Sequence, residues 1–300
     1  MGIKKDKILV LANPAAGSGK GLEVIRKVSE KLENLRLPHR ILLTEQDLNK
    51  LSLKKFEINN FNSLWVVGGD GTLNAILNHY GLPDIPIGLI SAGTGNDFAR
   101  AILETTDPEQ QMAIALRPNM SLIDIGYYNN RFFATGLGIG FDGLIAHKMK
   151  AYKGILSGSS AYYAAVLASL PFYDEKKIKI ETNDQTFEDY FFMVTVGNTK
   201  YFGGGFKVTP HANPADGVFD INIIGKTSIG FRFFNLKKVE NGTHLSLTKQ
   251  VQYLHSPTIK INCSEKLPCH ADGETFYADE LDISILPKAL KIKTRLIARG

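Results

Sequence analysis

Short apolar runs, each ended by small or turn-forming residues, recur through the first third of the sequence. Four of them have the length of buried β-strands, at residues 7–12, 39–44, 64–67 and 87–90. Helical spacing of apolar residues follows the first and third runs, and a polar segment at 47–59 also favours a helix. Strands that alternate with helices predict a parallel sheet covered by helices on both faces.

The pattern changes near residue 125, where strand-like segments begin to follow one another directly. An Asn129-Asn130 pair between two apolar segments predicts a β-hairpin, and residues 144–170 favour a helix. Further strands are predicted at residues 177–182, 190–197, 217–224, 258–261 and 281–285. This succession predicts an antiparallel sandwich or barrel. The basic, alternating segment 288–299 is expected to return to the first domain as an edge strand, which places the domains at 1–124 with 287–300 and at 125–286.

Three of the early apolar runs lead into glycine-rich turns, which read NPAAGSGKG (13–21), GGDGT (68–72) and AGTGND (92–97). Glycine lets a backbone approach a ligand closely, and N–H groups at a turn before a helix form an anion site. The first turn is not a Walker A loop, because Pro14 replaces its first glycine and Gly21 follows Lys20. The third lacks the dinucleotide pattern, because Phe98 occupies the third glycine position. All three follow strand carboxyl ends, so they are expected to converge on one phosphate-binding crevice; plain strand-to-helix turns are the alternative.

Acidic residues in these turns and in the second domain suit metal or proton chemistry. Asp70 lies inside the second turn and is expected to hold a metal ion, a water or a hydroxyl beside the phosphate, unless it only caps a helix. The loop 203–217 has oxygen donors of the kind that bind Mg²⁺ or Ca²⁺, or it is an ordinary Asp-Gly turn. The segment HADGE (270–274) presents Asp272 and Glu274 across a glycine, and either could accept a proton from a hydroxyl.

Composition narrows the class of protein without choosing a ligand. A hydrophobic content of 44% with 22% charged residues is typical of globular domains, and a net charge of +5 suits a nucleotide, a nucleic acid or an acidic membrane surface. Cys263 and Cys269 fit no common zinc spacing, but the adjacent His270 leaves a metal site as an alternative, and so few thiols suggest a reducing compartment. Neither a signal segment nor a transmembrane segment is predicted, and no nucleic-acid-binding module is recognised.

Taken together, these segments resemble the diacylglycerol kinase catalytic-domain family, in particular its bacterial lipid kinases, to which the sphingosine kinases are related. The resemblance rests on NPAAGSGKG (13–21), GGDGTLN (68–74), GTGNDFAR (93–100), IDIG (123–126), GGGFKVTPHANPADG (203–217) and ADGE (271–274). These motifs extend through nearly the whole chain. The resemblance implies a three-layer nucleotide-binding α/β domain followed by an antiparallel β-sandwich domain, with the active site between them.

The resemblance also implies roles for individual residues. ATP binding is implied at Asn13, Pro14, Ala15, Ala16, Gly17, Thr44, Gly68, Gly69, Asp70, Gly71, Thr72, Leu73, Asn74 and Thr94. The family's carboxylate–water–magnesium network is matched by Asp70, Asp97 and Asp124. Its structural Mg²⁺ loop is matched by Asn213, Asp216 and Val218, the outer two through backbone carbonyls. The late carboxylates supply the general base, with Glu274 favoured and Asp272 the alternative, and Asp70 is a further catalytic residue.

The function expected from the resemblance is transfer of the γ-phosphate of ATP to a lipid hydroxyl, which would convert diacylglycerol to phosphatidic acid. The alternatives are a kinase of another lipid, a kinase of a soluble metabolite like the NAD kinases, and a nucleotide-binding regulator without catalysis. We expect a cytoplasmic protein that contacts the inner face of the membrane peripherally and has no nucleic-acid partner; the resemblance also allows a homodimer. Lysines around the apolar segment 152–173 are expected to face anionic lipid, or to be the solvated flanks of a core helix: Lys148, Lys150, Lys153, Lys176 and Lys177.

Overall fold

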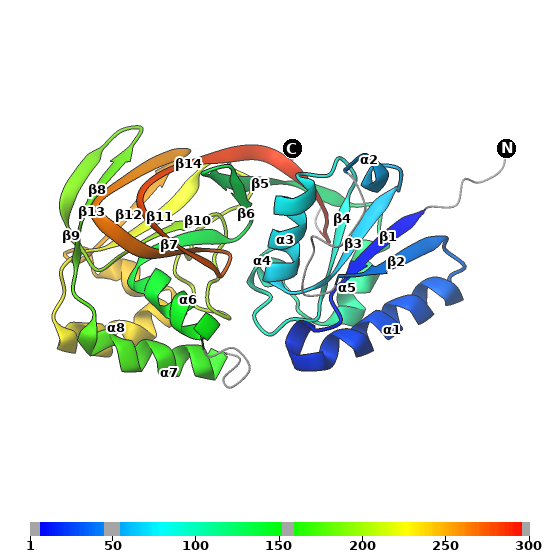
Figure 1. Ribbon diagram of the computed structural model, residues 1–300, viewed down its shortest axis with the longest axis horizontal. Helices are drawn as coiled ribbons and strands as arrows, with labels where there is room; N and C mark the ends of the chain where they lie inside the picture. Colours follow the sequence, from blue (N-terminus) through cyan, green and yellow to red (C-terminus); the bar gives the residue numbers. More distant parts are fainter. Residues whose placement is uncertain (1–6, 45–54, 152–158, 296–300) are drawn as a thin grey trace. The chain divides into compact units, whose positions relative to one another are not determined.

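The parallel α/β arrangement predicted for the first part of the chain is present in the structure. The computed structural model describes residues 7–44, 55–151 and 159–295. The chain folds into an α/β unit, residues 1–123 with 288–300, and a β unit, residues 124–287 (Figure 1). The predicted boundaries, after residue 124 and before residue 287, differ from these by a single residue at each end.

Parallel strands form the centre of the α/β unit. They are β1 (Ile8–Ala12), β2 (His39–Leu43), β3 (Ser63–Gly68) and β4 (Ile87–Ser91), in the order β2–β1–β3–β4. The end of β14 (Glu274–Lys293) extends this sheet, because Ile292 pairs in parallel with Ile87 of β4. Since β1, β3 and β4 are parallel neighbours, their carboxyl ends lie at the same edge of the sheet.

Helices cover both faces of this sheet (Figure 1). They are η1 (Ala16–Gly19, a 3₁₀-helix), α1 (Lys20–Asn34), α2 (Lys55–Ile58), α3 (Asp70–Tyr80), α4 (Asp97–Leu103) and α5 (Pro108–Ala115). The apolar sides of α1 and α5 pack around Trp65 on one face, whereas α3 and α4 lie over Val66 and Leu89 on the other. The helix predicted at 47–59 is present as α2, and its first part, 47–54, lies outside the described residues.

Sequence analysis did not predict α5, although the start of this helix carries a clear signal. Asp107 is the N-cap and accepts a hydrogen bond from Glu109 N–H (3.1 Å), and Pro108 occupies the first helical position. Gln111 of α5 is buried and binds the end of β4, because its Nε2 donates to Ser91 Oγ (2.9 Å) and its Oε1 accepts from Ser91 N–H (2.6 Å). This helix therefore fixes the strand end from which the third glycine turn begins.

The β unit consists of antiparallel strands, as the sequence indicated. β5 (Met120–Tyr128) and β6 (Arg131–Phe133) form the predicted hairpin, in which Asn129 and Asn130 both have the positive φ that a two-residue turn requires. The other strands are β7 (Gly136–Gly140), β8 (Lys176–Thr182), β9 (Thr186–Phe191), β10 (Met193–Gly197), β11 (Phe219–Ile224), β12 (Val251–Ser256), β13 (Thr258–Ala271) and β14. The single strand predicted at 190–197 is wrong: the segment divides at Phe192, because β9 pairs with β8 whereas β10 pairs with β7 and β11.

β13 connects the two sheets of a sandwich. Its pairing is irregular between Asn262 and Leu267, and the part before this point pairs with β8 whereas the part after it pairs with β7. Side chains of β7, β10 and β11 pack against those of β8, β13 and β14 in one apolar core, which includes Ile139, Val194 and Ile261. Of the two architectures that the strand pattern allowed, the sandwich is therefore the correct one.

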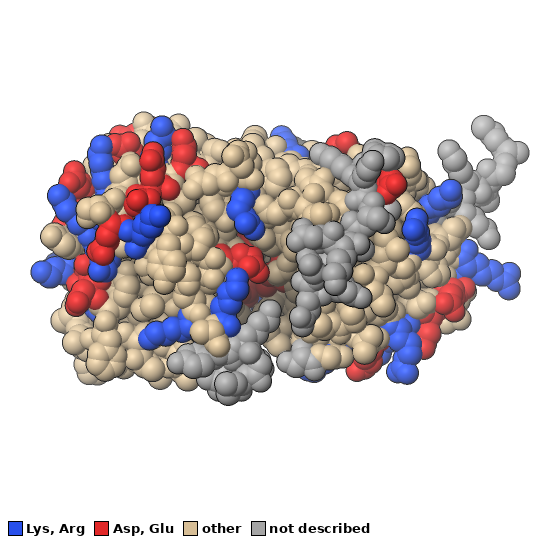
Figure 2. All heavy atoms as spheres, viewed as in Figure 1, with Lys and Arg blue, Asp and Glu red and all other residues tan. Residues whose placement is uncertain are grey.

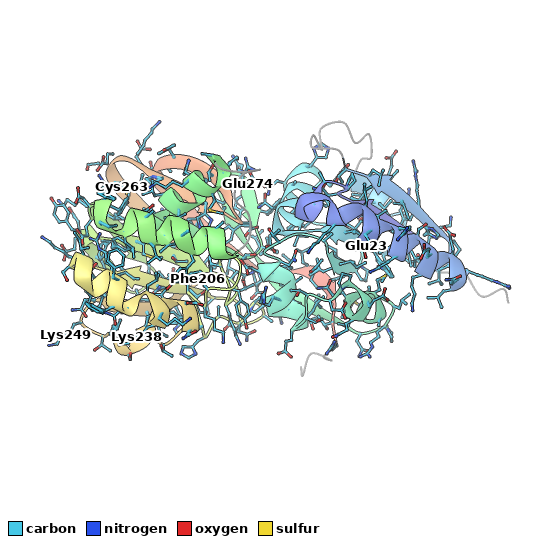
Figure 3. All side chains as sticks on the ribbon, turned by 90° about the horizontal axis from the view of Figure 1, so that it is seen from below. Glu23, Phe206, Lys238, Lys249, Cys263 and Glu274 are labelled. Atoms are coloured by element: carbon cyan, nitrogen blue, oxygen red, sulfur yellow. The ribbon has the colours of Figure 1, made fainter. Side chains whose placement is uncertain are left out.

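Helices cover the outer face of the sheet formed by β7, β10, β11 and β12. They are α6 (Phe141–Ala151), α7 (Ser159–Ser169), η3 (Leu170–Phe172), α8 (Ile229–Asn241) and η4 (His244–Ser246). A second apolar core lies beneath them, with Phe141, Val166 and Leu236 from the helices and Met193 from β10. The helix predicted at 144–170 corresponds to α6 and α7, and the residues between them lie outside the described part. The sequence did not predict α8, which runs beside α7 (Figures 1 and 3).

None of the helices in the described ranges is long and apolar enough to cross a lipid bilayer.

Candidate functional site

The three glycine-rich turns meet at the carboxyl edge of β1, β3 and β4, as predicted. Asn13 N–H donates to Val67 O and Ala92 N–H donates to Gly68 O, both at 2.9 Å, so each turn begins beside its neighbour. Asn13 also reaches the start of α3, where its Nδ2 donates to Thr72 Oγ1 (3.3 Å). The structure therefore brings the three turns into a single cluster of loops within the α/β unit.

Several glycines in these turns are required by contacts between the loops. A Cβ atom on Gly93 would lie 2.7 Å from Gly69 Cα, and one on Gly17 would lie 2.1 Å from Ala92 O. Gly71 differs, because a Cβ atom there would meet no heavy atom within 4 Å. Packing within the described chain therefore does not require glycine at this position, and the first turn of α3 is open on this side.

Asp70 fastens the second turn to the third. Its Oδ2 accepts a hydrogen bond from Asp97 N–H (2.9 Å), and its Oδ1 accepts one from Phe98 N–H (3.0 Å). Both donors lie at the start of α4, where backbone N–H groups have no partner within the helix, so Asp70 caps this helix from another turn. This contact gives Asp70 a role in positioning the loops, and the metal or hydroxyl role predicted for it stays a prediction.

A pocket of about 260 Å³, a volume that includes space open to solvent, lies at these turns. Gly69, Asp70 and Asn96 line it beside apolar residues of β3, β4 and α4. Backbone N–H groups at the start of a helix such as α3, and in the turns beside it, are suitable donors to phosphate oxygens. The turns beside this pocket therefore suit the phosphate chain of a nucleotide.

The remaining residues predicted to bind ATP differ in exposure. Thr44 is buried, and both its N–H and its Oγ1 donate to Ala12 O, so its side chain holds the end of β2. Three further side chains are buried in the first turn of α3, namely those of Thr72, Leu73 and Asn74. Thr94 is exposed in the third turn, and Ala15 in the first turn donates its N–H to Asn13 Oδ1 (3.0 Å). The accessible part of the predicted set is thus the backbone of the first and second turns together with Thr94.

Asp124 lies in the β unit, where it holds the predicted magnesium loop. Its buried carboxylate accepts a hydrogen bond from Gly217 N–H (2.7 Å), and its own N–H donates to Pro214 O (2.7 Å). Asp70 and Asp97 belong to the α/β unit. The contacts of Asp124 therefore connect it with residues 213–218, and a shared network with Asp70 and Asp97 stays a prediction.

The loop 213–218 offers oxygen donors for a hard cation. Asn213 and Asp216 are exposed, Val218 is half-buried, and Asp216 Oδ1 accepts a hydrogen bond from Val218 N–H (3.2 Å). Among the described residues, no group of three or more His, Cys, Asp and Glu side chains could hold a metal ion. A Mg²⁺ ion in this loop would depend on one carboxylate, backbone carbonyls and water, which are ligands that Mg²⁺ accepts. The magnesium loop therefore stays a prediction.

Asp272 binds the backbone at the start of β7. With Gly273 it forms the two-residue turn between β13 and β14, in which both residues have positive φ. The Asp272 carboxylate accepts hydrogen bonds from backbone N–H groups of Ala134 (2.8 Å), Thr135 (2.8 Å) and Gly136 (3.2 Å). These donors hold the carboxylate in one position and occupy acceptor positions on both of its oxygens. The Asp272 carboxylate therefore has a structural role.

Glu274 is the more accessible of the two late carboxylates. It begins β14 directly after the turn, and about half of its side chain is exposed. Its partner is Lys150 of α6, whose Nζ lies 3.1 Å from Glu274 Oε2. An exposed ion pair of this kind is weak, so the carboxylate can exchange Lys150 for another partner.

A buried acid–base pair, Asp142 and His270, supports this turn. His270 Nε2 lies 3.2 Å from Asp142 Oδ2, Tyr162 OH donates to Asp142 Oδ1 (3.2 Å), and Gly273 N–H lies 3.4 Å from His270 Nδ1. Burial opposes charge on Asp142, but His270 and the neighbouring hydroxyls bring its pKa below the usual 3.8. Burial also opposes charge on His270, but the Asp142 carboxylate brings its pKa above 6.5. The sequence had given no role to Asp142.

The zinc alternative raised by Cys263, Cys269 and His270 has no support in the structure. Cys269 is buried and donates to Leu267 O (3.4 Å), and burial raises the pKa of its thiol to about 12. A thiol of this kind does not readily become the thiolate that zinc requires.

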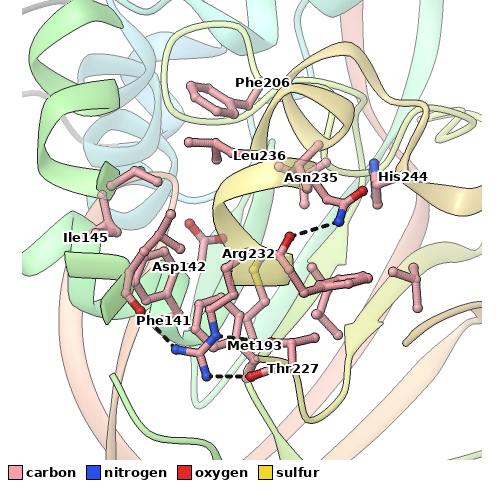
Figure 4. A pocket seen from close by; sticks show the side chains of 18 of the residues that line it. Phe141, Asp142, Ile145, Met193, Phe206, Thr227, Arg232, Asn235, Leu236 and His244 are labelled. Atoms are coloured by element: carbon pink, nitrogen blue, oxygen red, sulfur yellow. Dashed lines mark hydrogen bonds between the residues drawn. The ribbon is translucent and has the colours of Figure 1, made fainter. Parts of the chain in front are cut away.

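An apolar pocket opens beneath the helices of the β unit. It has a volume of about 700 Å³, including space open to solvent, and Phe141, Ile145 and Leu236 are among the residues that line it. Figure 4 shows Asp142 and Arg232 among these apolar side chains. Asp142 therefore both lines this pocket and binds His270 behind the turn that carries Glu274.

Two family models match the chain. The diacylglycerol kinase catalytic domain matches residues 7–128, and the YegS C-terminal NAD kinase beta sandwich-like domain matches residues 136–294. This chain belongs to the diacylglycerol kinase family. The family assignment agrees with the motifs of both units, from the glycine turns to the ADGE segment.

Named relatives in the diacylglycerol kinase family are distant in sequence. The chain is 27% identical over 305 residues to a Bacillus subtilis protein provisionally named lipid kinase YtlR. The alignment covers 95% of this chain and 98% of that protein. It is 26% identical over 282 residues to a diacylglycerol kinase of Staphylococcus carnosus, with 92% and 90% covered. A crystal structure of a provisional diacylglycerol kinase from Bacillus anthracis has the same fold, with a TM-score of 0.78, 23% identity, and coverage of 97% of this chain and 98% of that one.

Proposed function

We propose that this member of the diacylglycerol kinase family transfers the γ-phosphate of ATP to the hydroxyl of a lipid, with diacylglycerol as the acceptor and phosphatidic acid as the product. The apolar pocket of the β unit carries this proposal. An almost wholly apolar lining suits an acyl chain and offers little to a sugar or a nucleotide. It also shares Asp142 with the pair that supports the Glu274 turn.

The α/β unit supplies the donor side of the proposed reaction. The backbone of residues 68–72 and the open first turn of α3 at Gly71 receive the phosphate chain of ATP. When bound, Mg²⁺ neutralises phosphate charge, and Asp216 with the carbonyls of Asn213 and Val218 would hold a structural ion in the β unit. The hydrogen bond between Asp97 N–H and the Asp70 carboxylate holds the second and third turns in fixed relative positions for phosphate binding.

Glu274 accepts the proton of the lipid hydroxyl in this proposal. Its carboxylate is accessible and, among the described residues, pairs with an exposed lysine, whereas the oxygens of Asp272 are bound by three backbone N–H groups. The role of Asp272 is then to fix the turn from which Glu274 projects. Phosphoryl transfer needs mostly positioning and charge neutralisation, so one well-placed base and a fixed acceptor hydroxyl are sufficient chemistry.

The deciding experiment measures transfer from γ-labelled ATP to a lipid panel in mixed micelles, with Mg²⁺ and with EDTA. We expect Mg²⁺-dependent label in diacylglycerol. The same assay on NAD and other soluble metabolites tests the soluble-kinase alternative, which requires label there and none in lipid. ATP binding without label in either panel would support the regulator alternative and contradict the proposal. The proposed location is peripheral, at the cytoplasmic face of the membrane.

A further inference from the structure

Large apolar side chains are exposed on one side of the β unit. Phe172 in η3 is 85% exposed and Phe234 in α8 is 87% exposed, and Ile229 and Phe233 of α8 are also exposed. These four residues are called the α8–η3 surface below. Isolated exposed apolar residues are normal, but several aromatic rings on adjoining elements mark an interaction site.

The elements of the α8–η3 surface are held together by one buried arginine. Arg232 of α8 donates through Nη1 to Leu170 O (2.9 Å) and Tyr173 O (2.7 Å), and its Nη2 lies 2.7 Å from Glu175 Oε1. Its guanidinium also lies over the ring of Phe192, 4.2 Å from the centroid. η3 and α8 are therefore fixed to each other and to the core, so their exposed rings do not depend on a flexible loop.

The opposite side of α8 faces the apolar pocket. Arg232 and Leu236 are buried and line the pocket (Figure 4), and Leu170 of η3 also lines it. The same helix thus presents Phe233 and Phe234 to the outside and Leu236 to the pocket. A lipid that leaves a bilayer at the α8–η3 surface has only this short helix to pass before its chain lies among apolar side chains.

Charge around the α8–η3 surface suits an anionic bilayer. Lys226, Lys237 and Lys238 are exposed at the two ends of α8. Lys237 pairs with Glu240 (3.1 Å), and Asp174 beside Phe172 is an exposed acid, so the local balance is one positive charge. Aromatic rings flanked by lysines are typical of helices that lie at the interface of a membrane.

Four of the five lysines that the sequence had placed at anionic lipid, or at the solvated flanks of a core helix, have polar partners within the protein, and their contact with lipid stays a prediction. Lys148 Nζ donates to Ser169 Oγ (2.7 Å), Lys150 pairs with Glu274, Lys176 with Glu265 (3.0 Å) and Lys177 with Glu188 (2.7 Å). Figure 2 shows acidic and basic side chains intermixed over β8, β9 and β13. Lys153 lies outside the described residues. The β8–β9 face is therefore close to neutral and carries no comparable group of exposed rings.

We propose that the α8–η3 surface binds an anionic lipid bilayer, and that this contact delivers the acceptor lipid to the adjoining apolar pocket. The second part rests on the proposed kinase function, whereas the first does not. Phe172, Ile229, Phe233 and Phe234 enter the interfacial region of the bilayer. Lys226, Lys237 and Lys238 then lie at the level of the anionic headgroups.

The test is co-sedimentation of the purified full-length protein with vesicles, in the absence of ATP. One vesicle contains phosphatidylcholine and phosphatidylglycerol in equal amounts, and the other contains phosphatidylcholine alone. The F172S/F234S variant is expected to bind the mixed vesicles about tenfold more weakly than wild type, because two exposed rings are removed from the interface. The K226E/K238E variant is expected to lose the preference for phosphatidylglycerol, by about fivefold for each lysine.

The matched control is Leu22→Ser, which removes an exposed apolar side chain from α1 in the α/β unit and should leave vesicle binding unchanged. Thermal melting of each variant establishes that it is folded, and the five exchanged side chains are all exposed. Equal vesicle binding by F172S/F234S and wild type would contradict the proposal that the α8–η3 surface binds a bilayer. The absence of wild-type binding to either vesicle would contradict it as well. Suppose that F172S/F234S binds vesicles more weakly but wild type transfers phosphate to no lipid. This result would support the membrane-binding surface and contradict the proposed lipid kinase function.

Discussion

The imidazole of His270 lies 3.2 Å from the carboxylate of Asp142, and both side chains are almost completely buried. This pair joins α6 to the last residues of β13, and through Gly273 it reaches the turn that carries Glu274. A buried ion pair of this kind is costly to break, because the remaining partner keeps an uncompensated charge. We therefore expect the geometry of the Glu274 turn to depend on pH.

Replacement of His270 by glutamine should destabilise the protein by about 3 to 5 kcal/mol at mildly acidic pH. The raised pKa of His270 means that its contribution is complete below 6.5 and is lost as pH rises through the higher folded value. The lowered pKa of Asp142 means that its contribution is present above 3.8 and is lost as pH falls through the lower folded value. Urea unfolding of both proteins at several pH values should show a smaller difference at alkaline pH. The exposed His79→Gln serves as control, and an H270Q penalty that is equal at every pH would contradict the ion pair.

Asp70→Ala should abolish phosphate transfer and leave the protein folded. The substitution removes the acceptor of the Asp97 and Phe98 N–H groups, so α4 loses its cap at a cost of about 1 kcal/mol and the third turn is released from the second. Transfer is measured with labelled ATP, and stability by thermal melting.

Asp107→Ala is the matched control for that experiment, because Asp107 caps α5 in the same unit through Glu109 N–H. It should show a similar loss of stability with transfer retained. Normal turnover by a folded D70A protein would contradict both the positioning role and the metal role of Asp70.

Glu274→Gln should lower the rate of transfer by about 10²- to 10⁴-fold without unfolding the protein, because the amide cannot accept the proton of the hydroxyl. Glu265→Gln is the control, since Glu265 is a similarly exposed carboxylate paired with Lys176 in the same unit. Steady-state kinetics at saturating ATP distinguish the two variants. A rate close to wild type for E274Q, together with inactive but folded D272N, would transfer the role of base to Asp272.

Alanine at Gly71 and at Gly93 should have opposite effects. Gly93→Ala places a Cβ atom 2.7 Å from Gly69 Cα, so the protein should lose about 1 to 3 kcal/mol of stability. Gly71→Ala meets no protein atom and lies in the first turn of α3, so stability should be unchanged or rise by up to about 1 kcal/mol. ATP affinity, measured by calorimetry, should nevertheless fall for G71A, because the methyl group occupies the side on which phosphate is proposed to lie. Unchanged ATP affinity in G71A would place the phosphates elsewhere.

The sequence predicted those elements in which local pattern and burial agree. Runs such as 64–67 are apolar on both faces and end in glycine, so strand, turn and helix follow from a few neighbouring residues. The hairpin at Asn129-Asn130 was predictable for the same reason, because its turn needs positive φ at both positions. Convergence of the three turns followed from parallel strands alone.

Of the two helices that the sequence missed, α5 has a clear capping signal that was overlooked, whereas α8 is a helix in which pattern and burial disagree. In α8 only Arg232 and Leu236 are buried while Phe233 and Phe234 face outward, so the hydrophobic spacing does not show the buried side. The pairing of Asp142 with His270, and the three backbone donors to Asp272, join segments far apart in the sequence, and only the folded sheet brings them together. Sequence reasoning could identify ADGE as a carboxylate motif but could not separate the supporting carboxylate from the accessible one.

The short turn between β13 and β14 is held in a fixed position by hydrogen bonds. Because the Asp272 carboxylate binds the successive amides of Ala134, Thr135 and Gly136, the tip of the hairpin is fixed to the backbone at the start of β7. Glu274 therefore projects from backbone whose conformational freedom was already lost during folding, and an arriving acceptor need not order it. The amides of Ala134, Thr135 and Gly136 should accordingly be among the slowest in the molecule to exchange with deuterium, a trace of the site that can be recorded without any substrate.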